Sequence, residues 1–156
     1  MDLQALFLRQ HQRVYRLALL YFKNTSDAED AVSSIFLKVA EKQPAFENEA
    51  HETAWFITAT RNYCKDTFKS FWRKSVTLGD LPETPDSSLE GLWVAECILR
   101  LPDKYRELLY LYYFEGYSVK ELSALLSRKE STLQTQLADA RKKLKRLLEK
   151  EGYVHE

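Results

Sequence analysis

Cysteine, histidine, glycine and proline are all scarce in this chain of 156 residues, and each shortage narrows the choice of fold and chemistry. The two cysteines, Cys64 and Cys97, form no CxxC pair, and the three histidines are scattered along the chain. The sequence therefore predicts neither a metal site nor a disulfide framework. Four glycines and four prolines leave long stretches without a helix breaker, which favours helices.

Long hydrophobic runs are also missing. The run LLYLYYF covers only residues 108–114, whereas a membrane-spanning helix needs about 18 apolar residues or more. No targeting segment is recognisable at the amino terminus, so we expect a soluble, cytoplasmic protein. The sequence also lacks a recognisable acid–base pair, nucleophile arrangement or phosphate-binding loop. We therefore expect no enzymatic activity, no cofactor and no small-molecule substrate.

The net charge is zero, but the charges are unevenly distributed. Residues 1–74 carry 11 basic and nine acidic side chains, and residues 100–156 carry 12 basic and nine acidic ones. Between them, residues 75–99 hold five acids and no base. Two mildly basic blocks thus flank an acidic connector, and the overall charge argues neither for nor against nucleic acid as a partner.

Apolar periodicity and capping residues predict an all-α chain of two small helical domains. In the first domain we expect a helix over 3–22, a second helix that starts at a capping box of Ser26 and Glu29, and a third helix over 53–72. A loop over 44–52 would separate the last two. The next stretch, rich in proline and acidic residues, predicts a flexible acidic linker over 75–89.

In the second domain the sequence predicts four helices. They cover about 89–100, 102–114, 118–126 and from 129 or 130 to about 150. Gly116 suits the position just after a helix, and Ser118 with Glu121 forms a capping box. The last two helices have the spacing of a helix-turn-helix, which inserts its second helix into the major groove of DNA.

A row of cations distinguishes residues 61–74. Arg61, Lys65, Lys69 and Arg73 recur every four residues, which predicts a row along one helix face, and Lys74 follows. Aromatic residues interleave with them. Such a face can follow a phosphate backbone while its rings stack on unpaired bases. The pattern is equally typical of a solvated helix face above an aromatic core.

Three segments together resemble the extracytoplasmic-function sigma factors, which are small bacterial subunits that direct RNA polymerase to promoters. They are SDAEDAVSSIFLKVAEK followed by TAWFITATRNYCKDTFK, then LPDKYRELLYLYYFEGYSVKELSALL, and finally TLQTQLADARKKL. The resemblance implies a domain over 1–74 that binds core polymerase and the −10 element. It implies a second domain over 90–156 that binds the −35 element. Core RNA polymerase and promoter DNA would be the partners, and an anti-sigma factor could be a third.

The resemblance also assigns residues to each contact. Helix 53–74 would melt the −10 element through Arg61, Asn62, Lys65, Lys69, Arg73 and Lys74. Helix 129–150 and the turn before it would contact the −35 element through Arg128, Lys129, Ser131, Thr132, Gln134, Thr135 and Gln136. Core polymerase would bind Asp27, Asp30, Ser33 and Ser34.

Several positions depart from the family pattern. Ser33 and Ser34 stand where members usually have Gln and an acid, and Ser127 replaces the usual glycine of the turn. Gln134, Gln136 and Asp139 stand where members often have basic residues. Because fewer cations face phosphate, we expect −35 binding that is weak, sensitive to salt and assisted by polymerase.

Two other functions stay open on the sequence. A stand-alone helix-turn-helix regulator would bind duplex DNA without polymerase, although it leaves residues 1–74 unexplained. A degenerate sigma-like protein would bind polymerase without initiating transcription.

Overall fold

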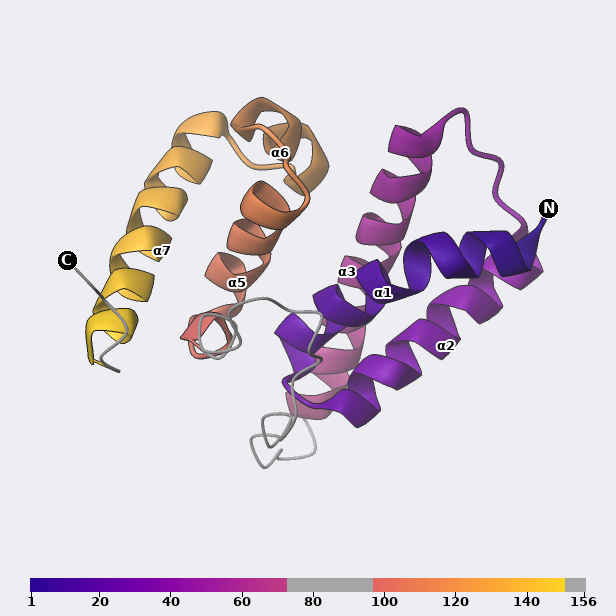
Figure 1. Ribbon diagram of the computed structural model, residues 1–156, viewed down its shortest axis with the longest axis horizontal. Coiled ribbons are helices and arrows are strands. Elements are labelled where there is room, and N and C mark those ends of the chain that lie inside the picture. The colour runs from indigo at the N-terminus through magenta and orange to yellow at the C-terminus, as the bar shows by residue number, and fades with distance from the viewer. Residues whose placement is uncertain (73–96, 151–156) are drawn as a thin grey trace. The chain divides into compact units, whose positions relative to one another are not determined.

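The computed structural model describes the backbone of residues 1–72 and 97–150 and the side chains of residues 1–67 and 97–150. All elements in these ranges are helices, so the predicted all-α fold is confirmed (Figure 1). The chain divides into two compact units, residues 1–83 and 84–156. The predicted linker over 75–89 and most of the predicted helix over 89–100 lie outside the described residues.

The described part of unit 1, residues 1–72, contains three helices, α1 (Leu3–Phe22), α2 (Thr25–Lys42) and α3 (Glu49–Trp72). The sequence predicted the bounds of α1 and the end of α3. The start of α2 was predicted incorrectly, because Asn24 and not Ser26 caps this helix. The Asn24 side chain accepts a hydrogen bond from the Asp27 backbone N–H at 2.8 Å. Asn24 is already extended, and asparagine caps a helix at least as well as serine, so the helix begins earlier.

The core of unit 1 comes from one apolar stripe on each helix. The stripes follow the 3.6-residue period of a helix, which brings residues three and four apart to one face. Fully or almost fully buried members are Val14 and Leu17 of α1, Ile35 and Val39 of α2, and Phe56 and Ile57 of α3. α3 packs against both α1 and α2, so these stripes fix which face of α3 is left to solvent (Figure 1).

Helix α3 begins four residues earlier than the predicted Thr53. The Asn48 side-chain oxygen accepts a hydrogen bond from the His51 N–H at 2.8 Å, which is the pattern of a helix cap. The first turn also contains Glu49 and Glu52, whose negative charge suits a helix amino terminus. The predicted loop over 44–52 is therefore shortened to residues 43–48.

Unit 2 contains α5 (Asp103–Leu109), the π-helical turn η1 (Tyr110–Phe114), α6 (Val119–Leu126) and α7 (Glu130–Lys150). The predicted helix ending at Phe114 is thus present, but its last turn is widened. The predicted capping box is confirmed, with Ser118 and Glu121 each accepting a hydrogen bond from the other's backbone N–H. α6 and α7 form the predicted helix-turn-helix pair.

Leucines from α5, η1, α6 and α7 contribute to the core of unit 2. Leu108 of α5, Leu111 of η1, Leu122 of α6 and Leu133 of α7 are all completely buried. Leu137, one turn beyond Leu133, is buried as well. The carboxy-terminal end of α7 is less covered, because Leu144, Leu147 and Leu148 are only half-buried. The amino-terminal half of α7 is therefore the part fixed most firmly by packing.

Among the helices of the described ranges, none is both long enough and apolar enough to cross a membrane. In the same ranges, three or more His, Cys, Asp or Glu side chains do not come together as metal ligands would.

Gly116 allows a test of the predicted turn. Its φ is +76°, and a Cβ atom added there would meet nothing within 4 Å, so substitutions act through the backbone alone. We expect Gly116→Ala to lower the free energy of unfolding of unit 2 by about 1 kcal/mol, because in the left-handed conformation a Cβ atom lies too close to the carbonyl oxygen that follows it in the chain. Gly116→Asn is the matched control, since asparagine tolerates this conformation better. Equal losses in chemical unfolding would contradict this explanation.

Candidate nucleic-acid and polymerase interfaces

The outer face of α3 carries only part of the predicted cationic row. Asn62 and Lys65 are exposed, as a contact with DNA requires. Arg61 is only 6% exposed, so its predicted place in an exposed row is wrong. It lies on the face of α3 that also carries the completely buried Ile57 and Cys64, four residues before and three after it. The Lys69 side chain, Arg73 and Lys74 lie outside the described residues.

The loop over 43–48 is held against α3 by an aromatic side chain. Phe46 is half-buried and meets Trp55 edge-on, with ring centroids 5.8 Å apart, and it also contacts the ring of Phe56. The Glu47 N–H donates to His51 Nδ1 at 3.1 Å. Because these contacts hold residues 46 and 47, the loop has a defined position beside the start of α3.

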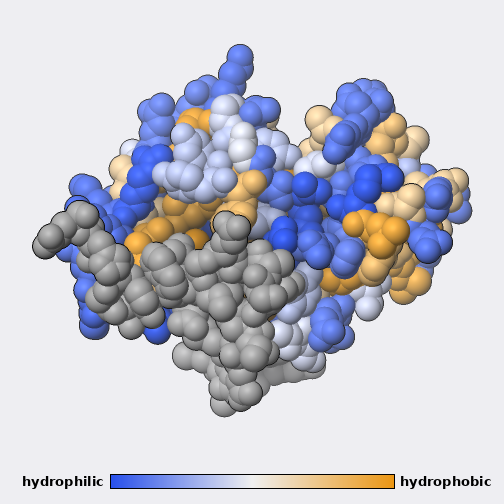
Figure 2. Space-filling model, viewed as in Figure 1, coloured by the Kyte–Doolittle hydropathy of each residue, from blue (hydrophilic) through white to orange (hydrophobic). Residues whose placement is uncertain are grey.

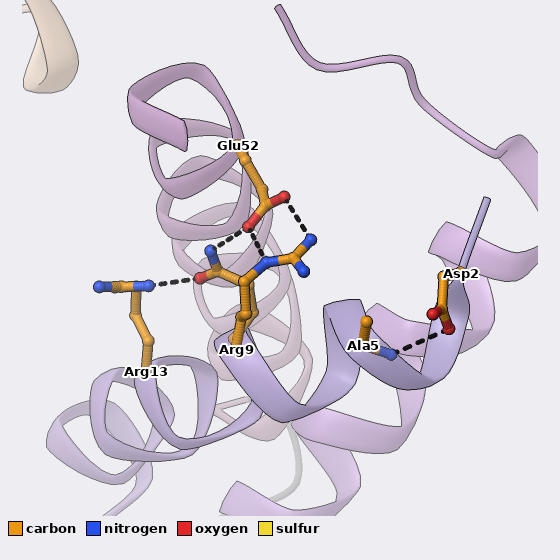
Figure 3. A network of polar contacts seen from close by, with 6 residues as sticks. Asp2, Ala5, Arg9, Arg13 and Glu52 are labelled. Carbon is orange, nitrogen blue, oxygen red and sulfur yellow. Dashed lines mark hydrogen bonds and ion pairs between the residues drawn. The ribbon is translucent and has the colours of Figure 1, made fainter. Parts of the chain in front are cut away.

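A buried carboxylate fixes the first turn of α3 to α1 (Figure 3). Glu52 is 7% exposed and receives two hydrogen bonds from the Arg9 guanidinium, at 3.1 Å from Nε and 2.9 Å from Nη2. The Gln10 amide donates a third at 2.7 Å. Hydrogen bonds from Arg9 hold the pKa of the Glu52 carboxyl below its usual value, and burial opposes this shift. The result is a clamp of α1 on α3, four residues after the loop.

The sequence contained a signal for this clamp that was missed. Gln10 occupies the apolar stripe of α1, where Leu6 and Val14 lie four residues before and after it, and it is 2% exposed. A polar side chain buried in such a stripe requires a hydrogen-bonding partner from another segment. The stripe of α1 therefore predicted a polar contact, although it could not indicate Glu52 as the partner.

The predicted polymerase face of α2 is only partly exposed. Asp30, Ser33 and Ser34 are exposed, but Asp27 is half-buried and accepts a hydrogen bond from the capping residue Asn24 at 2.8 Å. Asp27 thus has a structural role at the start of α2. Leu37 lies beside the serines and is 62% exposed. It was not among the predicted polymerase-binding residues. Its position outside the apolar stripe of α2 was the available signal.

In unit 2 the predicted DNA-contacting residues fall into two groups. The exposed ones are Lys129, Ser131, Thr132, Gln134 and Thr135. Arg128 differs, because its guanidinium donates to Glu107 and to Gln136, each at 3.1 Å. Glu107 is 2% exposed. The Arg128 guanidinium is bound to this buried carboxylate, which conflicts with its predicted assignment to DNA.

Cations also gather on the second half of α7. Arg141 donates a hydrogen bond to the Tyr113 hydroxyl at 2.6 Å and lies over the rings of Tyr112 and Tyr113. This contact raises the pKa of Arg141 further above its usual value. Tyr113 and Phe114 are each 57% exposed. On the face shown in Figure 2, hydrophobic side chains form small separate areas among hydrophilic ones.

Both units match models of known protein families. Residues 6–74 match the model described as Sigma-70 region 2, and residues 91–144 match the one described as Sigma-70, region 4. The region 2 match lies in the first helical unit, and the region 4 match lies in the second. They define the class of the protein as a sigma-70-type DNA-binding transcription factor.

Whole-chain relatives narrow this class. RNA polymerase sigma factor SigZ of Bacillus subtilis is 31% identical, and the match covers 96% of this chain and 88% of the relative. ECF RNA polymerase sigma factor SigM of Mycobacterium tuberculosis is 27% identical over 154 residues, with 96% and 77% covered. The chain belongs to the extracytoplasmic-function family of RNA polymerase sigma factors. It recognises promoters and initiates transcription together with RNA polymerase.

Solved structures agree with this fold. The sigma factor RpoE, crystallised with the anti-sigma factor NepR from Bartonella quintana, aligns with a TM-score of 0.78 over 95% of this chain and 97% of that chain. CnrH, in complex with the cytosolic domain of CnrY, aligns with a TM-score of 0.66 over 94% and 87%. Each is 21% identical in sequence, so these likenesses establish the fold alone.

The clamp at Glu52 predicts how stability depends on pH. Because the folded-state pKa of Glu52 is lowered, its contribution is present above the unfolded-state pKa of about 4.3 and is lost as pH falls through the folded value. We expect Glu52→Gln to lower the free energy of unfolding by about 1–3 kcal/mol at pH 7. The loss should shrink on acidification below about pH 4.3.

Chemical unfolding followed by circular dichroism from neutral to acidic pH measures this effect. Glu41→Gln is the control, because Glu41 is an exposed glutamate of α2. A loss for Glu52→Gln that stays constant down to the most acidic sample would contradict the assigned role of the carboxylate.

Proposed function

We propose that α3 and the loop over 43–48 melt the −10 element of the promoter. The observation that carries the proposal is the position of Asn62 and Lys65, exposed on a helix whose first turn is clamped to α1 by Glu52. Extruding a base from a duplex costs a few kcal/mol, which contacts with protein must supply. A preformed loop and helix can supply them because little chain entropy is lost on binding.

The −35 element is contacted by the exposed part of the amino-terminal half of α7. Lys129 supplies a cation for phosphate, and Ser131, Thr132, Gln134 and Thr135 supply hydrogen-bonding groups for base edges or backbone. Asp139 is also exposed and repels phosphate. The contact is therefore weak by itself and depends on polymerase bound to the rest of the chain.

Core RNA polymerase docks on α2. Asp30, Ser33 and Ser34 contribute polar contacts, and the exposed Leu37 contributes the apolar area that two serines cannot. An exposed leucine beside polar groups is a typical centre for a protein interface with a polar rim. Asp27 acts on this surface only indirectly, by holding the start of α2.

The wider setting follows from this role. Because RNA polymerase and promoter DNA are the partners, the protein acts in the cytoplasm and carries out no reaction of its own. The structurally similar sigma factor RpoE was crystallised with the anti-sigma factor NepR. An anti-sigma factor is accordingly a further partner of this chain.

Transcription with purified components separates this function from its alternatives. The full chain is mixed with core RNA polymerase and a library of promoter fragments, and run-off transcripts are sequenced. Specific transcripts support the proposal. Duplex binding without polymerase would instead support a stand-alone regulator, and polymerase binding without transcripts would support a degenerate sigma-like protein.

Lys65 provides the mutational test of the −10 contact. We expect Lys65→Ala to reduce open-complex formation and to lower the slope of log affinity against log salt by roughly 0.7–0.9, the value for one lost phosphate contact. Asp66→Ala is the control of opposite charge, because Asp66 is the exposed neighbour. It should leave the open-complex yield unchanged or raise it. If both folded variants lose the same yield, Lys65 is not a DNA contact.

Leu37 provides the test of the polymerase contact. We expect Leu37→Ser to weaken binding to core polymerase about tenfold, because an apolar side chain at an interface centre contributes about 1–2 kcal/mol. Leu8→Ser is the matched control, since Leu8 is a similarly exposed leucine, 67% against 62%. Fluorescence titration of the labelled chain with core enzyme measures both. Equal affinities would rule out Leu37 as the docking residue.

A further inference from the structure

The turn between α6 and α7 is closed by its own hydrogen bonds. Ser127, at the end of α6, has a φ of +55°, which reverses the chain as glycine commonly does. The Ser123 hydroxyl then donates to the Arg128 carbonyl oxygen at 2.5 Å, and the Arg128 N–H donates back to the Ser123 carbonyl oxygen at 3.3 Å. The backbone of Arg128 is therefore fixed against α6.

The side chain of Arg128 connects this turn to two helices. Nη2 lies 3.1 Å from Oε1 of Glu107, which is buried in α5, and Nη1 donates to Oε1 of Gln136 in α7 at 3.1 Å. A guanidinium is a planar fork of donors, so it can satisfy two acceptors at a fixed angle to one another. Through these contacts one side chain sets the position of α7 relative to α5 and to the turn.

The contact also fixes the orientation of the Gln136 amide. Arginine has donors and no acceptor, so the carbonyl oxygen of Gln136, and not its nitrogen, must face Arg128. Glutamine reads adenine in the major groove by using its oxygen and its nitrogen together. With the oxygen held by Arg128, Gln136 offers a base mainly its N–H groups, which suit acceptors such as guanine N7 and O6 or thymine O4.

We propose that Arg128 is a positioning residue for promoter reading: it holds the amino-terminal half of α7 in place and restricts Gln136 to acting as a hydrogen-bond donor. This inference rests on the proposed contact between α7 and the −35 element. It assigns no phosphate contact to Arg128. Base selection at one upstream position then depends on a side chain that does not touch DNA.

The test compares base selection with salt dependence in the full chain bound to core polymerase. Promoter fragments randomised over the upstream element are transcribed, and sequencing of the templates gives the discrimination at each base position. Affinity for the preferred fragment is then measured over a range of salt concentrations. Arg128→Lys is the main variant, because lysine keeps the charge but is a point charge without the planar fork.

A positioning role predicts that Arg128→Lys lowers discrimination at one upstream position by about fivefold or more, with the salt slope unchanged. Arg128→Ala should lose the same discrimination, also without a change of slope. Lys129→Ala is the matched control in the same turn. It should lower the slope by about 0.9 and leave discrimination unchanged.

The outcomes that overturn the inference are distinct from those that overturn the proposed function. If the unmodified chain shows no preference over the upstream element, the assignment of α7 to the −35 element fails, and the role of Arg128 fails with it. If the unmodified chain shows a preference that Arg128→Lys retains, only the positioning role fails. A slope lowered by about 0.9 in Arg128→Ala would make Arg128 a phosphate contact.

Discussion

A buried carboxylate that must be paired in one geometry is the constraint on which both helices of the proposed DNA contacts depend. Glu52 accepts hydrogen bonds from Arg9, 43 residues away in sequence, and Glu107 accepts one from Arg128, 21 residues away. Removing a carboxylate from water is costly unless hydrogen bonds replace the lost hydration. Apolar stripes alone leave packed helices some freedom to shift, whereas a guanidinium and a carboxylate allow few arrangements. The pairing therefore fixes the start of α3 and the turn before α7.

This arrangement explains how a chain without net charge can act on DNA. Its cations are divided between structure and surface: Arg9 and Arg128 hold the fold, while Lys65 and Lys129 face solvent. Few of these exposed cations belong to the proposed DNA contacts of the described residues, so the proposal implies an affinity for DNA alone that is low and depends on salt. In the proposed function, polymerase supplies the remaining affinity, and α3 and α7, each held within its own unit, contact the −10 and −35 elements.

Local sequence rules predicted much of the fold, because they describe local physics. The bounds of α1, the capping box of Ser118 and Glu121, and the turn at Gly116 each follow from neighbouring residues alone. The early start of α3 depends on Asn48, whose role as a cap was not predicted. The function was predicted from the family resemblance, and the two family models and the SigZ relative confirmed the family.

The candidate sites were harder to predict, because exposure and partners depend on contacts between distant segments. A four-residue spacing places Arg61 and Lys65 close together, yet the packing of α3 against α1 and α2 buries the first and exposes the second. Similarly, Arg128 has the position of a DNA contact in sequence, and only the fold brings Glu107 within its reach.

Melting of the −10 element by this chain can be tested by chemical probing of unpaired thymines with permanganate, on a promoter bound by the full chain and core RNA polymerase. We expect reactive thymines on the non-template strand at the −10 element, and a stable complex in which every thymine stays protected would rule out melting by this chain.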